Sequence, residues 1–151
     1  MGAMNILSIP LLLALVAGTL VALQAPTNAM LSRSLGSPIS AAFVSFLVGT
    51  AALALIVLLS PSRADGAALR GLPWYAWLGG VYGAVFVAVA AYGAPRIGVA
   101  ALLMAMIAGQ LLMALGLDHF GALGLERQPV SLARVGGLAL VIAGVLLVRR
   151  G

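Results

Sequence analysis

The chain has 151 residues, of which 64% are hydrophobic and 7% are charged. Its eight basic residues are all arginines and its three acids are Asp65, Asp118 and Glu126, which leaves a formal charge of +5. Soluble domains are about a quarter charged, so this composition excludes an ordinary soluble globule. The arginines are scattered singly between apolar runs, so we expect no nucleic-acid-binding face. The chain has no cysteine and one histidine, and we expect no metal site, no cofactor and no enzyme activity.

Five apolar runs reach or approach the length of about 20 residues that a membrane-spanning helix needs. They predict an all-α integral membrane protein, a single transmembrane domain over residues 1–151. The expected spans are residues 6–27, 39–59, 74–92, 97–117 and 130–148. The turn Gly36-Ser37-Pro38 precedes the second span and is typical of a helix start. The fifth span is the weakest, because Arg134 must extend to the headgroup region.

The first run contains a polar pair, Gln24 and Asn28, which lie one helical turn apart and share a face. Pro26 between them removes a backbone hydrogen bond. A polar pair beside a broken helical turn is typical of a transporter's substrate site. The alternative is hydrogen bonding between helices around a routine proline. The N-terminal residues before this run carry no Lys or Arg, so we do not expect a signal peptide.

The next runs add further candidates. Small residues recur at every fourth position of the second span, at Ala41, Ser45 and Gly49, as close packing in lipid requires. In the third span Trp77 and Tyr82 could form a flat apolar wall of a binding site, although interfacial anchoring and plain packing are the alternatives. Gln110 is an amide well inside the fourth span and needs a polar partner.

The last two spans hold the remaining candidates. Asp118 and His119 end the fourth span and could relay protons. The alternative is a capping pair at the headgroups, with Asp118 held by Arg127 or Arg134. In the fifth span Gly137 and Gly144 are seven residues apart, which predicts a self-contact seam in a dimer.

Arginines are shared equally between the two expected sides of the membrane. With five spans, one side carries Arg63, Arg70, Arg127 and Arg134, and the other carries Arg33, Arg96, Arg149 and Arg150. The positive-inside rule acts through a difference between the sides, and here there is none. We therefore expect copies to insert in both orientations and to pair as an antiparallel homodimer. The alternative is a weakly biased chain that its partners orient.

Several segments together resemble the five-helix YdcZ-like family of the drug/metabolite transporter superfamily. They begin with Gln24-Ala-Pro-Thr-Asn28-Ala29, Ser45-Phe-Leu-Val-Gly49-Thr50 and Pro73-Trp74-Tyr-Ala-Trp77-Leu-Gly79-Gly80. The others are Pro95-Arg96-Ile-Gly98, Gly109-Gln110 and Asp118-His119-Phe120-Gly121. The resemblance implies an exporter of the bacterial inner (cytoplasmic) membrane and names no substrate.

The glycine spacing of the last span is also similar to the dimerisation helix of small multidrug resistance proteins, which work as antiparallel dimers. Those exporters carry a glutamate in their first helix. This chain has Gln24 and Asn28 there, and neither titrates, so proton exchange at that position is not expected.

These observations predict one half of a ten-helix inverted-repeat transporter, completed by dimerisation. We expect alternating access for a small, apolar or weakly polar molecule at Gln24, Asn28, Trp77, Tyr82 and Gln110. Two alternative functions remain open. In these alternatives the chain is either a non-transporting accessory subunit, or half of a heterodimeric transporter whose partner is another chain. A channel ranks lowest, since the spans hold few polar groups.

Overall fold

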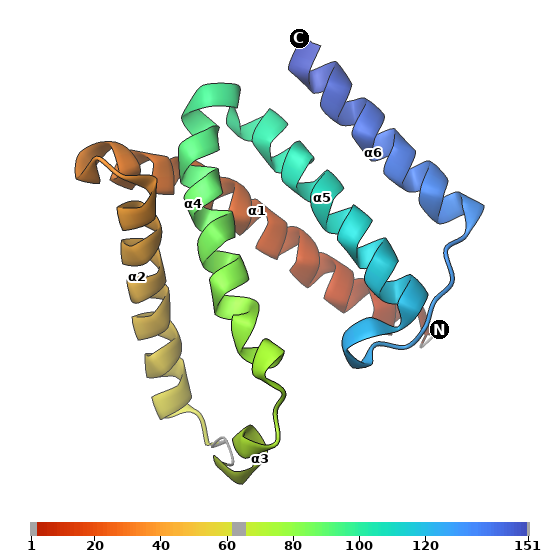
Figure 1. The fold of residues 1–151 in the computed structure, drawn as a ribbon, viewed down its shortest axis with the longest axis horizontal. Coiled ribbons are helices and arrows are strands. Elements are labelled where there is room, and N and C mark those ends of the chain that lie inside the picture. The colour runs from red at the N-terminus through yellow and green to blue at the C-terminus, as the bar shows by residue number, and fades with distance from the viewer. Residues whose placement is uncertain (1–2, 62–65, 151) are drawn as a thin grey trace. The chain divides into compact units, whose positions relative to one another are not determined.

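The computed structural model describes the backbone of residues 3–61 and 66–150, and the side chains of residues 9–61, 66 and 69–148. Every regular element in these ranges is helical, as expected. The elements are α1 (Ala3–Leu35), α2 (Pro38–Leu59), α3 (Gly66–Arg70), the 3-10 helix η1 (Trp74–Leu78), α4 (Gly79–Ile97), α5 (Val99–Phe120), the 3-10 helix η2 (Ala122–Gly124) and α6 (Leu132–Arg150) (Figure 1).

Within the described residues, four helical segments are long and apolar enough to cross a membrane. They are Ile9–Leu35, Pro38–Leu59, Trp74–Ile97 and Val99–Phe120, and a shorter apolar stretch, Leu132–Val148, lies in α6. The expected all-α membrane fold with five apolar helices is therefore confirmed. Arg63, which enters the charge balance, lies outside the described residues, as do the side chains of Arg149 and Arg150.

Two helices extend through residues that the sequence analysis assigned to connections. Helix α1 continues through Pro26 and Asn28 to Leu35, and α4 continues through Pro95 to Ile97. The expected links, residues 28–38 and 93–96, are therefore wrong. The actual breaks are Gly36-Ser37 and Gly98, where both glycines have positive φ, +70° and +79°. A left-handed backbone favours glycine, which has no Cβ to clash, and proline is tolerated within membrane helices.

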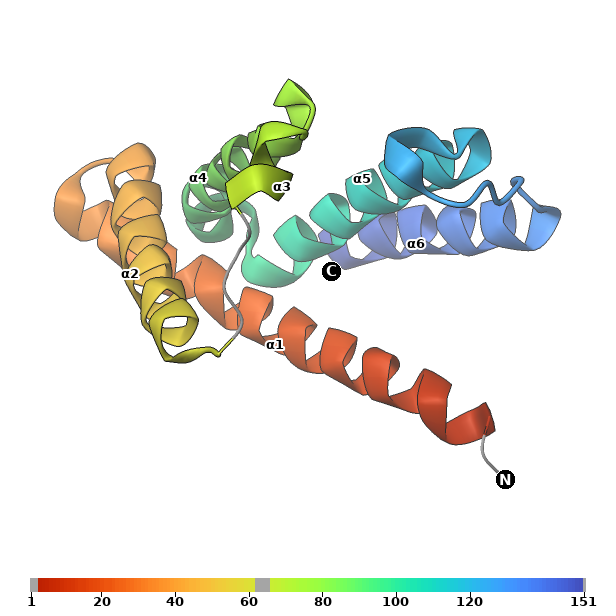
Figure 2. The same cartoon turned by 90° about the horizontal axis from the view of Figure 1, so that it is seen from below.

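The chain divides into two compact units, residues 1–96 and residues 97–151. In the first unit α1 and α2 pack against each other near their connection, and their free ends diverge (Figures 1 and 2). Ser37 caps α2 by accepting a hydrogen bond from the Ser40 amide, and Pro38 occupies the first turn, as the turn sequence predicted. The second unit is a hairpin in which α5 and α6 lie side by side (Figure 2).

The buried apolar side chains described in the first unit are almost all alanines. They are Ala25, Ala29, Ala41, Ala42, Val87, Ala90, Ala91 and Ala94. Small side chains allow helix backbones to approach closely, which is how helices pack where lipid is the solvent. Large aliphatic side chains point outward along the same helices, for example Leu58 at 82% exposed. This is the pattern of a protein surrounded by hydrocarbon.

Candidate functional site

A groove between α1 and α2 contains three of the polar side chains of the first unit, Gln24, Ser45 and Thr50. It has a volume of about 180 Å³ and is lined by Gln24 of α1 and by Ser45, Phe46, Gly49, Thr50 and Leu53 of α2. One amide and two hydroxyl side chains thus line an apolar cleft. Gln24 also lines a shallow surface hollow on the other side of α1. A few polar groups in a mostly apolar concavity are typical of a small-molecule site.

The small-residue spacing of α2 explains how the groove forms. Ala41 is fully buried, and one turn later Ser45 lies in the groove, followed by Gly49. A Cβ built on Gly49 meets nothing within 4 Å, so the absent side chain keeps this part of the groove open. Phe46 closes one side, because its ring packs against Gly83 of α4, where an added Cβ would lie 3.0 Å from Cζ.

Asn28 is the most deeply buried polar residue that the structure describes, at 3% exposed. Its Nδ2 has no hydrogen-bond partner among the described residues. An unsatisfied buried amide costs about 1–3 kcal/mol, so such a group calls for an explanation. The alternative to a substrate site was that Gln24 and Asn28 hydrogen-bond to a neighbouring helix. Within the described residues, Asn28 Nδ2 makes no such bond.

The hydroxyls of α1 are different, because the helix itself satisfies them. Thr19 Oγ1 donates to the Val16 carbonyl at 2.7 Å, and Thr27 Oγ1 donates to the Gln24 carbonyl at 2.9 Å. Both threonines are exposed. Asn28 is thus set apart from its polar neighbours by both burial and an unused donor.

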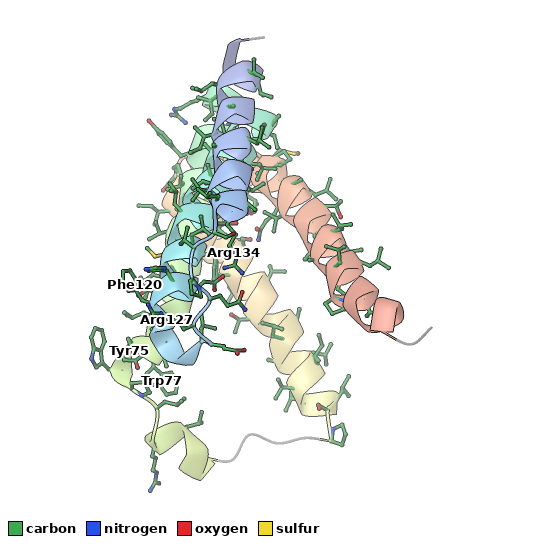
Figure 3. All side chains as sticks on the ribbon, turned by 90° about the vertical axis from the view of Figure 1, so that its right-hand side faces the viewer. Tyr75, Trp77, Phe120, Arg127 and Arg134 are labelled. Atoms are coloured by element: carbon green, nitrogen blue, oxygen red, sulfur yellow. The ribbon has the colours of Figure 1, made fainter. Side chains whose placement is uncertain are left out.

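Asn28 and the other predicted binding residues, Trp77, Tyr82 and Gln110, do not line this groove. Trp77 on η1 and Tyr82 on α4 are 60% and 64% exposed, and Figure 3 shows Trp77 near Tyr75 on the segment that precedes α4. Gln110 is exposed on α5, in the second unit. Sequence reasoning missed Ser45 and Thr50 as site candidates, although both lie in a segment that carried the family resemblance. Two hydroxyls near a glycine in an apolar run were the available signal.

Asp118 and His119 bind the loop that follows α5. Asp118 Oδ2 pairs with Nη1 of Arg134 at 3.3 Å, and the Asp118 carbonyl accepts from the Gln128 amide at 2.7 Å. The His119 carbonyl accepts from Arg127 Nε at 3.1 Å, and its Nδ1 accepts from the Val130 amide at 3.4 Å. Figure 3 shows Arg127 and Arg134 beside the end of α5. These contacts match the capping alternative, and proton coupling by the pair stays a prediction.

The two glycines of the expected dimer seam have different surroundings within the hairpin. A Cβ on Gly144 would lie 3.0 Å from Cε of Met104 in α5, so this glycine packs against its own chain. Gly137 has open space and lines a groove of about 410 Å³ between α5 and α6, together with Asp118 and Arg134. The seam stays a prediction, and Gly137 is the position that leaves room for it.

Comparison with known families gives one match that spans most of the chain. The family described as "Putative inner membrane exporter, YdcZ" matches residues 9–147. No curated protein and no solved structure matches the chain.

Proposed function

The chain belongs to the YdcZ family of inner-membrane exporters, and from this premise we propose that it exports a small, weakly polar molecule bound at the α1–α2 groove. The apolar helices indicate a protein that crosses the membrane several times, and the family indicates the inner membrane. The family is one of transporters and not of enzymes, so the polar groups of the groove are assigned to binding.

The observation that carries this proposal is the unused donor of Asn28. Its Nδ2 is buried without a hydrogen-bond partner among the described residues, and Asn28, which does not itself line the groove, lies one helical turn from Gln24, which does. A cargo carbonyl, hydroxyl or ether oxygen would satisfy this donor. A site that is incomplete without cargo binds it selectively, because a molecule lacking that oxygen leaves the amide unpaired.

We infer that the working unit is an antiparallel homodimer that operates by alternating access. Five helices correspond to one half of an inverted-repeat transporter, and an odd number of spans requires the second identical half to insert in the opposite orientation. Arg33 and Arg96 line one common pocket, which supports their assignment to the same side of the membrane in the balanced arginine count. The lipid bilayer and a second copy of the chain are then the partners, and nucleic acid is not.

Transport by reconstituted protein tests the role of the groove. Proteoliposomes are loaded with a mixture of small neutral metabolites, and compounds lost from the lumen are identified by mass spectrometry against protein-free vesicles. We expect the wild-type protein to release at least one compound. Gln24→Ala and Asn28→Ala each remove one binding group and should slow that release about tenfold or more, as expected when one to two hydrogen bonds to cargo are lost.

Thr19→Val is the matched control on the same helix, because its hydroxyl bonds to its own helix and lies outside the groove. It should release the compound at the wild-type rate. Unchanged release by both Gln24→Ala and Asn28→Ala, with correctly folded protein, would remove the groove from the transport path.

A further inference from the structure

A second pocket lies at the connected end of α1 and α2 and differs in chemistry from the groove. It measures about 470 Å³ and is lined by Ala29, Ser32, Arg33, Gly36, Pro38, Ala91, Pro95 and Arg96. Two exposed arginines from different helices therefore line one open pocket together with Ser32. Alanines and prolines form its apolar part.

Among the described residues of its own unit, the positive charge of this pocket has no carboxylate partner. Asp65, the acidic residue of this unit, lies outside the described residues. The ion pair among the described residues, Arg134–Asp118, belongs to the second unit. The C-terminal ends of α1 and α4 each contribute about half a negative charge, which is too little to balance two arginines.

Arg96 is held in a defined orientation by Tyr92. Its guanidinium carbon lies 3.6 Å from the centre of the Tyr92 ring, and its Nη1 donates to the Tyr92 carbonyl. Stacking on the ring fixes the plane of the guanidinium, and its remaining N–H groups can still bind an anion. Arginine binds phosphate by such a planar, multidentate arrangement.

Both arginines occupy the last turns of membrane helices, so the pocket lies at the depth of the lipid headgroups. We propose that Arg33 and Arg96, with Ser32, form a binding site for a phosphate group. The phosphate belongs either to an anionic phospholipid headgroup or to a free phosphate in the adjacent solution. This site is separate from the groove and does not depend on the proposed transport function.

The test measures thermal unfolding of the purified full-length protein in dodecyl maltoside by circular dichroism. Didecanoyl phosphatidylglycerol is the probe, and didecanoylglycerol, which lacks the phosphate, is the matched lipid. We expect the phosphatidylglycerol to raise the unfolding midpoint by about 4 °C or more at saturation, and the diacylglycerol not to raise it. Arg33→Gln/Arg96→Gln should lose this rise. Arg70→Gln, which removes an exposed arginine outside the pocket, should retain it.

Inorganic phosphate, at constant ionic strength against chloride, identifies the source. A rise with phosphate that also requires the two arginines indicates a free anion, whereas a rise with the lipid and not with phosphate indicates a headgroup. The proposal is overturned if neither probe raises the wild-type midpoint, if the diacylglycerol matches the phosphatidylglycerol, or if the double variant responds like the wild type.

A second pair of variants keeps the proposal testable should the double variant not fold. Tyr92→Phe keeps the ring under Arg96 and should bind phosphatidylglycerol as the wild type does. Tyr92→Leu removes the ring and should weaken binding about two- to fivefold. Equal affinities of these two variants would show that the stacked Arg96 does not hold the phosphate.

Discussion

At the scale of single residues, the polar groups of the apolar helices fall into three kinds. Thr19 and Thr27 satisfy their hydroxyls on carbonyls of their own helix and need no ligand. Asn28 is buried with an unused donor, and Asp118 and His119 hold a loop. The sequence singled out Asn28, Asp118 and His119 but could not separate their roles, because burial and hydrogen-bond partners depend on which neighbouring segment faces each side chain.

The unused donor of Asn28 predicts an unusual effect on stability. Asn28→Leu replaces an unsatisfied amide by an apolar side chain of similar size, so the free energy of unfolding should stay the same or rise by up to about 1 kcal/mol. Export should fall in the same variant. Unfolding in detergent, followed by circular dichroism, gives the stability. A loss of more than about 2 kcal/mol would show that Asn28 holds the helices together and would contradict its assignment to cargo.

The ion pair between Asp118 and Arg134 should contribute only modestly to the free energy of unfolding. Both side chains are more than a third exposed, at 38% and 36%, so solvent screens their attraction. In a double-mutant cycle of Asp118→Asn and Arg134→Gln we expect a coupling energy of about 0.2–1 kcal/mol. Export by Asp118→Asn should stay within twofold of the wild type if the pair is structural. Abolished export with unchanged stability would instead support proton coupling through Asp118 and His119.

At the scale of helices, apolar length predicted each membrane helix, but α1 and α4 extend beyond the ends expected for them at residues 27 and 92. Pro26 is followed by nine further helical residues and Pro95 by two, so neither proline ends its helix. The boundaries are at Gly36, Gly98 and Gly121, where the backbone has positive φ. In water a proline within a helix is a strong stop signal, but in a membrane neighbouring helices can supply the missing backbone partner, and sequence pattern does not show where those neighbours are.

The C-terminal cap of α5 gives a test at this scale. Gly121 has φ +62°, and a Cβ there would lie 3.2 Å from the Leu125 carbonyl oxygen and 3.3 Å from Arg127 Cβ. Gly121→Ala should lower the free energy of unfolding by about 1–2 kcal/mol. Gly116→Ala, inside the same helix with open space around it, should be neutral or stabilising by up to about 1 kcal/mol. Thermal unfolding of both variants makes the comparison, and equal midpoints would contradict this account of the cap.

The predicted dimer seam can be tested on two adjacent glycines of α6. Gly136 and Gly137 both have open space, but Gly137 lies on the same helical face as Gly144. Gly137→Leu should reduce the dimer fraction about tenfold, whereas Gly136→Leu should leave it unchanged. Energy transfer between differently labelled copies in vesicles measures that fraction. Identical fractions in the two variants would place the seam elsewhere.

At the scale of the whole molecule, composition and the even distribution of arginines predicted more than any motif. Composition and the lengths of the apolar runs indicated the membrane and the five apolar helices, since both follow from hydrocarbon thickness. The need for a second copy, drawn from the arginine distribution, stays a prediction. The groove could not be predicted in full, because its α2 wall of Ser45, Gly49 and Thr50 depends on the rotation of α2 about its axis. The identity of the cargo could not be predicted either, because it depends on the positions of single side-chain atoms in the groove.

Antiparallel pairing is the central claim, and the orientation of single copies tests it most directly. The chain has no cysteine, so Gly71→Cys places one thiol in the connection between α2 and α4. Gly71 is exposed and has no positive φ, so the substitution should be tolerated. A membrane-impermeant maleimide is applied to right-side-out and to inverted membrane vesicles. We predict labelling of about half of the copies in each preparation. Labelling confined to one preparation would contradict the antiparallel homodimer.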